Sequence, residues 1–463
     1  MRRLSLFIGV LLSGCALSPV QEAPDISLST HYTQALEKSS AAEDLSDWWT
    51  HFSDPNLDHL IALAKERNYD LQTAYYRIEA VRGRYRTETG NLWPAFSLSA
   101  SAIRSRISQN LFDASFLGPA EQSLFQWGFD AFWEWDFFGK LRAKRAAAGY
   151  DVLQEEEEFR DLLLVLCADV ARTYVDICTL QADLTVLSNM LAVRTALYDL
   201  QEEKYRSGLA PLQILEEERA SLYALERLYV ERNRALQTLH HHLSLLLGET
   251  PEEPSFVFSG TEEIPQAPLF KSVGIPSDLL RRRPDIRKAE YLIAASSRRS
   301  QAAVAELFPR FSLEADWGFA ANKFPKWLSK ESNNWNVGPF FSMPICEFGR
   351  ILGAIDEQDA LLQAALSTYQ QTVLTALEDT ENALTAYGNA LITYELSQRE
   401  FMAKQEEALL EETLFMSGLN SALTSLQAEL QMLEKKRVWI ESKRNASTQL
   451  IALYKALGGG WSC

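Results

Sequence analysis

Aromatic and polar residues alternate most regularly in Phe125-Gln126-Trp127-Gly128-Phe129-Asp130-Ala131-Phe132-Trp133-Glu134-Trp135-Asp136-Phe137. A β-strand sends successive side chains to opposite faces of its sheet. The period of two therefore predicts a strand over about residues 123–138, with an aromatic face and a polar face. Trp and Phe on one face, with carboxylates on the other, are typical of a strand between lipid and water.

Three further segments show the same alternation, at about residues 96–107, 311–321 and 334–346. Each run is close to the ~9–11 residues that cross a bilayer as a tilted strand. A soluble antiparallel sheet with one buried face gives the same pattern, but the density of Trp and Phe favours the membrane interpretation. Carboxylates on the polar faces are candidate lumen residues. Rings of Asp or Glu there would favour cations. The candidates are Asp130, Glu134, Asp136, Glu314 and Asp316.

Several motifs occur twice at one spacing. Phe138-Gly139-Lys140 returns as Phe348-Gly349-Arg350, Ser207-Gly208-Leu209 as Ser417-Gly418-Leu419, and Leu247-Gly248 as Leu457-Gly458, each 210 residues later. Leu92–Leu98 returns as Leu307–Leu313, 215 residues later. A constant offset over more than a hundred residues indicates a tandem duplication. We predict a first repeat over residues 57–250, a proline-rich connector over 251–284 and a second repeat over 285–463.

Each repeat contains long helical patterns interrupted by Ser-Gly-Leu. The long helices are predicted at about residues 140–204, 211–247, 351–415 and 421–457, and shorter ones at about 57–89 and 285–305. Apolar residues recur at steps of three and four, as at Leu184, Leu187 and Leu191, which is typical of a coiled-coil seam. The first long helix would extend ~95 Å at 1.5 Å per residue. We interpret these helices as staves of a hollow barrel that projects from the membrane into the periplasm.

The four predicted strands cannot close a barrel alone. Unpaired strand edges cannot lie in hydrocarbon, where each unsatisfied backbone group costs several kcal/mol, so the sequence requires oligomerisation without fixing the number of subunits. Three protomers would supply twelve strands. The predicted fold class is a mixed α and β membrane protein, internally duplicated, with a trimeric 12-stranded β-barrel continued by a long periplasmic α-helical barrel.

The N-terminus carries a targeting signal. Arg2 and Arg3 precede the apolar run Leu4–Leu12, and Leu12-Ser13-Gly14-Cys15 looks like a bacterial lipobox. We expect residues 1–14 to be a signal peptide, Cys15 to be the lipidation site, and residues 15–56 to form a lipidated linker and belt segment. Buried acyl chains contribute ~0.8 kcal/mol per CH₂.

Composition excludes several functional classes. The formal net charge of −17 argues against nucleic acid as a partner. No phosphate loop, nucleophile elbow or metalloprotease helix occurs, so we expect neither an enzyme, a cofactor nor a metal site. His240, His241 and His242 are consecutive, and consecutive helical residues point in different directions. The run Arg281–Pro284 is interpreted as a packing and capping segment.

The chain resembles the outer-membrane efflux factors of tripartite pumps, the TolC-like family, and especially its lipoprotein branch. The resemblance covers nearly all of the mature chain, and its most specific motifs are Trp48-Trp49 with Phe52 and Asp54-Pro55, Leu279–Ile286, Phe308-Pro309 and Tyr454–Trp461. It implies a homotrimer in outer-membrane lipid, with a periplasmic adaptor and an inner-membrane efflux pump as partners. It also implies a channel that closes at the periplasmic tips of its helical hairpins.

The tips in this chain would be Gly208 and Gly418, and the resemblance places the gate residues just after them. The family usually has an aspartate nine residues after the second tip glycine, where this chain has Gln427. The candidate gate residues are Gly208, Glu216, Glu217, Gly418, Leu423, Thr424, Leu426, Gln427 and Glu429. We expect Leu423 and Leu426 to pack against a neighbouring protomer in the resting state.

The sequence favours a passive exit duct for drugs or other small toxic solutes, energised elsewhere. Two alternatives stay open. One is the outer-membrane duct of a protein-secretion system, and the other is a periplasmic coiled-coil adaptor without a pore, which would leave the aromatic strands and the lipobox unexplained.

Overall fold

The computed structural model describes residues 45–106, 108, 121–252, 263–265 and 282–460. The chain divides into two compact units, and the first contains Arg77–Glu156 and Lys288–Tyr369. The second contains Ile26–Tyr76, Glu157–Arg287 and Gln370–Cys463. Within the described ranges, no helix is long and apolar enough to cross a membrane.

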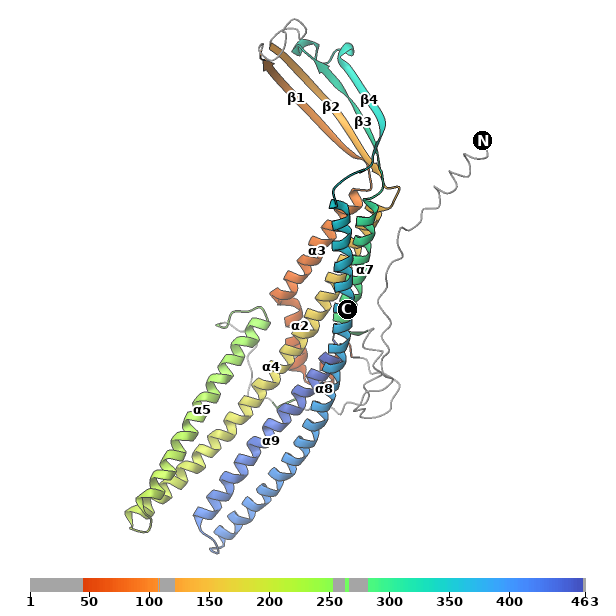
Figure 1. Cartoon of the computed structure of the whole chain (residues 1–463). Helices are drawn as coiled ribbons and strands as arrows, with labels where there is room; N and C mark the ends of the chain where they lie inside the picture. The colour runs from red at the N-terminus through yellow and green to blue at the C-terminus, as the bar shows by residue number, and fades with distance from the viewer. Residues whose placement is uncertain (1–44, 107, 109–120, 253–262, 266–281, 461–463) are drawn as a thin grey trace. The chain divides into compact units, whose positions relative to one another are not determined.

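The first unit contains one antiparallel sheet, in which sequence order and spatial order agree (Figure 1). Its strands are β1 (Ala95–Arg106), β2 (Glu121–Trp135), β3 (Arg310–Ala321) and β4 (Asn333–Ser342). Short 3₁₀ helices η2 (Phe324–Lys326) and η3 (Lys330–Ser332) join β3 to β4. The sheet therefore has two edge strands, β1 and β4.

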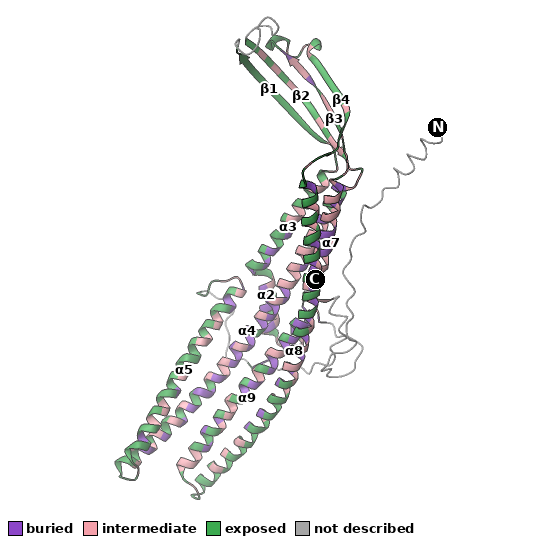
Figure 2. Cartoon of the chain, viewed as in Figure 1, coloured by how far each residue is buried: buried purple, intermediate pink, exposed green. Residues whose placement is uncertain are grey.

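The register places most aromatic residues of neighbouring strands on one face, whereas Phe132 and Phe340 lie on the face of the carboxylates. Trp127 lies opposite Phe319, and Phe129 lies opposite Trp317. Their rings stack, with centroids 5.5 Å apart in the first pair and 6.2 Å apart in the second. Much of this face stays exposed within the protomer, since Trp317 is 45% exposed (Figure 2). The sheet thus presents an apolar surface that the described part of the chain does not cover.

β4 is shorter than predicted. It ends at Ser342, whereas the alternation predicted a strand to about residue 346. Ser342 pairs with Arg310, the first residue of β3, so no partner strand remains for the residues that follow. The apolar alternation after Ser342 therefore continues in the sequence without a sheet.

The helices of the first unit pack through polar and aromatic contacts. They are the C-terminal part of α3 (Tyr69–Gly90), α7 (Pro284–Ala305), and the first turns of α4 (Lys140–Arg206) and α8 (Arg350–Met416). Arg299 of α7 donates to both carboxylate oxygens of Asp151 in α4, at 2.5 and 2.6 Å. Tyr150 and Tyr291 stack on each other at 6.4 Å. These contacts place α7 beside α4.

The second unit is built from two long hairpins. One consists of α4 and α5 (Leu212–Leu246), and the other of α8 and α9 (Ala422–Ala456). Their apolar stripes meet in a core that includes Tyr174, Ile177, Leu187, Tyr387 and Leu450, each less than 2% exposed. Burial on one stripe only is the expected result of the three- and four-residue spacing.

The predicted helix over residues 57–89 is two helices, α2 (Pro55–Arg67) and α3. Asn68 causes the break, because its side-chain oxygen accepts hydrogen bonds from the backbone N–H groups of Asp70 and Leu71. Its side-chain nitrogen donates to the Leu246 carbonyl at the end of α5. Asn is a preferred N-cap residue, so this residue ends one helix, starts the next and attaches both to the first hairpin.

The N-terminal and C-terminal motifs pack together. Trp48, in the 3₁₀ helix η1 (Trp48–Phe52), stacks on Tyr454 of α9 with ring centroids 5.1 Å apart. A Cβ on Gly460 would lie 2.8 Å from the Trp48 indole nitrogen, and one on Gly459 would lie 2.8 Å from the Leu45 Cβ. The glycines after α9 are therefore needed for this close approach.

Candidate functional site

Both hairpins turn with the same backbone geometry. Gly208 and Gly418 each have φ +73, the left-handed region that favours glycine. Gly208 N–H donates to the Tyr205 carbonyl and Leu209 N–H to the Lys204 carbonyl, and Gly418 and Leu419 repeat this pattern. This pair of bonds is the Schellman motif, which satisfies the last carbonyls of a helix. The two copies of the duplicated chain thus end their long helices in the same way.

The two tips differ in the helix that follows. Ser421 caps α9, because its hydroxyl accepts from the Thr424 N–H at 3.3 Å. Asn420 also donates to Glu411, which ties the second tip to α8. In the first tip Pro211 stands at the corresponding position and makes no side-chain cap. The second tip has more hydrogen bonds within its own hairpin.

The gate candidates of the second copy separate into two groups. Leu423 and Leu426 are half-buried and pack against the core of their own unit. Each of these side chains keeps an exposed part, so their contact with a neighbouring protomer stays a prediction. Gln427 and Glu429 are exposed.

The gate candidates of the first copy are exposed and paired locally. Glu216 accepts from Arg219 at 2.8 Å, and Glu217 accepts from the Gln213 amide at 3.0 Å. Arg219 also donates to the Tyr198 hydroxyl of α4 at 3.1 Å. These contacts lie at the surface, where water and salt screen them, so they leave the carboxylates available to other partners.

A second set of charged residues links the two hairpins above the tips. Arg437 of α9 donates to both oxygens of Asp183 in α4, at 2.6 and 3.2 Å. Arg444 donates to Asp176 at 2.6 Å. This pair lies seven residues later in α9 and seven residues earlier in α4 than the first pair. Arg232 of α5 reaches Asp183 at 3.6 Å. Together Asp176, Asp183, Arg232, Arg437 and Arg444 form what we name the hairpin link.

The hairpin link lies in a groove of about 980 Å³ lined by α4, α5 and α9. Burial lowers the pKa of the Arg444 guanidinium, but the hydrogen bonds and negative charges of Asp176 and Glu441 together outweigh burial, so the pKa is raised. Arg444 therefore stays charged and bound to its carboxylate. Bidentate Arg–carboxylate pairs combine charge with fixed geometry.

The sequence contains a signal for the hairpin link that lies outside the strand and seam patterns. Asp176 and Asp183 are seven residues apart, and so are Arg437 and Arg444. Opposite charges repeated at the heptad spacing on two helices are typical of flanking positions in a coiled coil. Since 254 residues separate Asp183 from Arg437, only the packing of the two hairpins pairs them.

The strand carboxylates lie on the polar face of the sheet. Asp130 and Asp316 are directly opposite each other in β2 and β3. Asn336 of β4 lies opposite Asp316 and extends the row. The Ser99 hydroxyl of β1 donates to Asp130 at 3.0 Å. Glu314 is exposed on the same face. Like charges directly opposite each other destabilise a sheet, so the pair of Asp130 and Asp316 does not stabilise the pairing of the strands.

Two of the five predicted lumen residues contact the start of α4. Glu134 forms an ion pair with Lys140 at 2.5 Å. Asp136 accepts hydrogen bonds from the backbone N–H groups of Leu141 and Arg142, at 3.0 and 2.8 Å. The prediction of Asp136 as a strand residue is wrong, because β2 ends at Trp135 and the carboxylate caps the helix.

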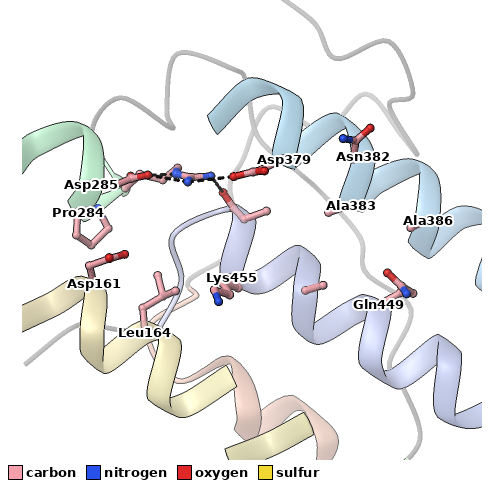
Figure 3. A pocket seen from close by; sticks show the side chains of 13 residues that line it. Asp161, Leu164, Pro284, Asp285, Asp379, Asn382, Ala383, Ala386, Gln449 and Lys455 are labelled. Atoms are coloured by element: carbon pink, nitrogen blue, oxygen red, sulfur yellow. Dashed lines mark hydrogen bonds and ion pairs between the residues drawn. The ribbon is translucent and has the colours of Figure 1, made fainter. Parts of the chain in front are cut away.

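Arg283 has the packing and capping role predicted for its segment. Its guanidinium donates to both oxygens of Asp285 and to the Ala456 carbonyl at the end of α9. Arg283 forms ion pairs with Asp285 at 2.7 Å and with Asp379 at 3.4 Å, and Figure 3 shows these two carboxylates at a cavity of about 490 Å³. The half-buried guanidinium, held by two carboxylates and a carbonyl, joins α7 to α8 and α9.

Burial lowers the pKa of His240, and His241 lowers it further. Within the described ranges, no group of three or more His, Cys, Asp or Glu residues could hold a metal ion. Cys15 lies outside the described residues.

Comparison with known proteins gives one consistent result. The sequence model of the family described as outer membrane efflux protein matches residues 60–249 and 275–459, one match for each repeat. The chain is similar to the antibiotic efflux pump outer membrane protein ArpC of Pseudomonas putida, with 27% identity over 97% of this chain and 94% of that protein. It is also similar to the outer membrane protein OprJ of Pseudomonas aeruginosa, with 28% identity over 99% and 95%.

Solved structures agree with these relatives. The outer-membrane channel OprN matches with a TM-score of 0.85 and 27% identity, over 96% of this chain and 100% of that chain. The open state of the outer membrane channel MtrE from Neisseria gonorrhoeae matches with a TM-score of 0.84 and 25% identity, over 97% and 99%.

Proposed function

Because this chain belongs to the outer membrane efflux protein family, we propose that it is the outer-membrane channel of a tripartite efflux system. It is a passive duct through which drugs or other small toxic solutes leave the cell. A periplasmic adaptor opens it, and an inner-membrane pump supplies the energy. The observation that carries this proposal is the match of the family to both repeats of one chain.

The free edges of the sheet support a trimer. β1 and β4 each have one neighbour within the protomer, and a strand edge in hydrocarbon must be paired. Pairing β4 of one protomer with β1 of the next in three copies closes a 12-stranded barrel. Exposed apolar residues along α8, such as Leu374 and Ile392, supply a surface for the neighbouring protomer in the helical barrel.

The two faces of the sheet support its orientation in that barrel. The aromatic face meets outer-membrane lipid, and the row containing Asp130 and Asp316 lines the lumen. Three copies would bring six of these carboxylates to one level, together with the exposed Glu314. Such a ring favours cationic solutes over anionic ones.

The hairpin link supports a gate at the tips. Opening moves the hairpins apart, so the bonds from Arg437 to Asp183 and from Arg444 to Asp176 must break or rearrange. Hydrogen bonds to charged groups contribute ~1.5–3 kcal/mol each, a scale that permits reversible opening by an adaptor. The exposed Gln427, Glu429, Glu216 and Glu217 would then form the polar rim of the opening.

Purified protein in planar lipid bilayers tests the channel directly. We expect stepwise conductance, with larger currents carried by K⁺ than by Cl⁻. A folded, lipid-inserted trimer that never conducts would contradict the proposal and favour the coiled-coil adaptor.

Cells that lack the gene test the kind of cargo. We expect them to accumulate more of a fluorescent drug than cells complemented with the wild-type gene, with the same set of secreted proteins. Unchanged drug accumulation with lost secreted proteins would favour the secretion duct.

A further inference from the structure

A groove of about 780 Å³ in the first unit concentrates positive charge. It lies between the last turns of α3 and the first turns of α4, and four of its ten lining residues are arginines, with no acidic residue among them. They are Arg82, Arg86, Arg142 and Arg145. In a chain with a net charge of −17, such a concentration is not explained by composition.

Nearby carboxylates neutralise the charges of the four arginines to different degrees. Arg82 is held at 2.8 Å by both Glu79 and Glu156. Arg142 is bound to Asp136 at 3.2 Å, and its side chain is 66% exposed. Arg86 lies 3.6 Å from Glu79, which is beyond hydrogen-bond distance, and its side chain is 74% exposed. These two side chains therefore keep most of their donors directed to solvent.

Arg145 has a neutral partner. Its guanidinium donates to the Tyr85 hydroxyl at 2.9 Å and lies 5.5 Å from the centre of the Tyr85 ring. Tyr85 also lies over Gly149, where a Cβ would be 3.5 Å from the ring. The tyrosine thus positions the guanidinium without neutralising its charge.

The groove adjoins the ends of the strands. α3 leads into β1, and β2 leads into α4, so Arg142 is seven residues from the end of β2 at Trp135. Exposed aromatic residues stand between the helices and the strands, among them Trp93, Trp135 and Phe137. Trp residues at strand ends are typical of the level of lipid headgroups in a membrane protein.

Charge and location together point to one occupant. We propose that the groove binds the headgroup of an anionic phospholipid in the periplasmic leaflet of the outer membrane. Arg86, Arg142 and Arg145 supply donors to its phosphate, because guanidinium groups bind phosphate oxygens in pairs. Basic pockets between helices at the membrane surface bind anionic headgroups on the same basis. The inference rests on the proposed membrane location of the sheet.

Native mass spectrometry of the delipidated full-length protein tests this binding. The probes are phosphatidylglycerol, phosphatidylethanolamine and inorganic phosphate, each added alone. We expect phosphatidylglycerol to remain bound and to raise the melting temperature more than phosphatidylethanolamine does. The double variant Arg86→Gln, Arg145→Gln should lower this preference roughly thirtyfold, since each cation near the membrane surface contributes about fivefold to the affinity.

The matched control is the double variant Arg206→Gln, Arg399→Gln, which removes two exposed arginines of the second unit. It should keep the wild-type preference. Equal loss in both variants, no preference in the wild type, or equal stabilisation by inorganic phosphate alone would overturn the proposal.

Conductance in phosphatidylethanolamine bilayers is measured on the same samples. Wild type and both variants should conduct alike, so a failure of the channel proposal is distinguishable from a failure of the lipid site.

Discussion

Gly128 of β2 and Gly318 of β3 lie directly opposite each other, and neither position has room for a side chain. A Cβ on Gly318 would lie 2.7 Å from the Gly128 Cα, and one on Gly128 would lie 2.9 Å from the Trp317 carbonyl oxygen. Glycine inside a strand often marks the close approach of another backbone. The two central strands therefore touch through their backbones beside the row containing Asp130 and Asp316.

Replacing Gly318 by Ala should disrupt the pairing of β2 with β3. The added methyl meets backbone, which cannot move aside as a side chain can, and overpacking of this kind costs ~1–3 kcal/mol. We expect a lower melting temperature and less trimer after solubilisation, measured by light scattering. Gly338→Ala in β4 is the control, because nothing lies within 4 Å of a Cβ there. Equal behaviour of the two variants would refute the prediction.

Removing the hairpin link should raise the resting conductance. In Arg437→Gln the Asp183 carboxylate loses two hydrogen bonds and keeps only the more distant Arg232. The lost bonds correspond to ~1.5–3 kcal/mol each, so the closed state should be populated less in bilayer recordings. Arg399→Gln is the control, since Arg399 pairs with Glu395 on its own helix. Unchanged conductance in Arg437→Gln, with the trimer intact, would place the gate elsewhere.

The packing of Trp48 on the end of α9 should be essential for stability. Trp48→Ala would leave a cavity beside Tyr454, and such truncations of buried aromatics cost ~3–5 kcal/mol. Gly460→Ala should also destabilise, because its Cβ would meet the Trp48 indole. Gly353→Ala in α8 is the control and should stabilise slightly, since its Cβ meets nothing within 4 Å and Ala is the better helix former. Thermal unfolding followed by circular dichroism measures all three variants, and equal melting temperatures would contradict the prediction.

Cys167 should contribute to stability in a pH-dependent way. Burial raises the pKa of its thiol from 9.0 to about 11, so the folded chain holds the proton more tightly than the unfolded chain. The contribution is fully present below pH 9 and is lost as the pH rises through about 11. Two pKa units correspond to ~2–3 kcal/mol. Urea denaturation from pH 7 to 11 should show a smaller decline for Cys167→Ala, and parallel curves would refute the assignment. Cys346, which is exposed, gives the control variant Cys346→Ala.

Cys15 should be acylated, with the barrel as a second attachment to the membrane. Mass spectrometry of protein from membranes should find a diacylglycerol on the mature N-terminal cysteine. Cys15→Ser should leave the channel assembled and in the outer membrane, although held less firmly. An unmodified Cys15 would refute the first statement, and complete release of Cys15→Ser with export preserved would refute the second.

Local patterns in the sequence predict most of the helices, strands and turns. The alternation around Trp127 predicted a strand, and the repeated Ser-Gly-Leu predicted the turns at Gly208 and Gly418, because period and turn chemistry depend on neighbouring residues. The family is confirmed by the match to both repeats. Asp136 has the even-numbered position of the polar face, so the alternation places it in the strand. In the structure its carboxylate binds the start of α4, which begins at Lys140.

The parts of the site that the sequence could not reveal depend on distant residues. Asp183 and Arg437 belong to different copies of the duplicated chain, and only the packing of α9 beside α4 brings them together. Leu423 and Leu426 pack against the core of their own unit, and this contact depends on distant residues and not on their local spacing.

The unlike caps of the two tips limit the symmetry of any ring built from this chain. The backbone repeats at Gly208 and Gly418, but Pro211 begins one returning helix and the capped Ser421 begins the other. In a rim of such protomers the two kinds of tip alternate. The same surface therefore recurs once per chain and not once per hairpin. A partner that repeats identically around the rim must therefore fit two different surfaces, or bind at every second tip.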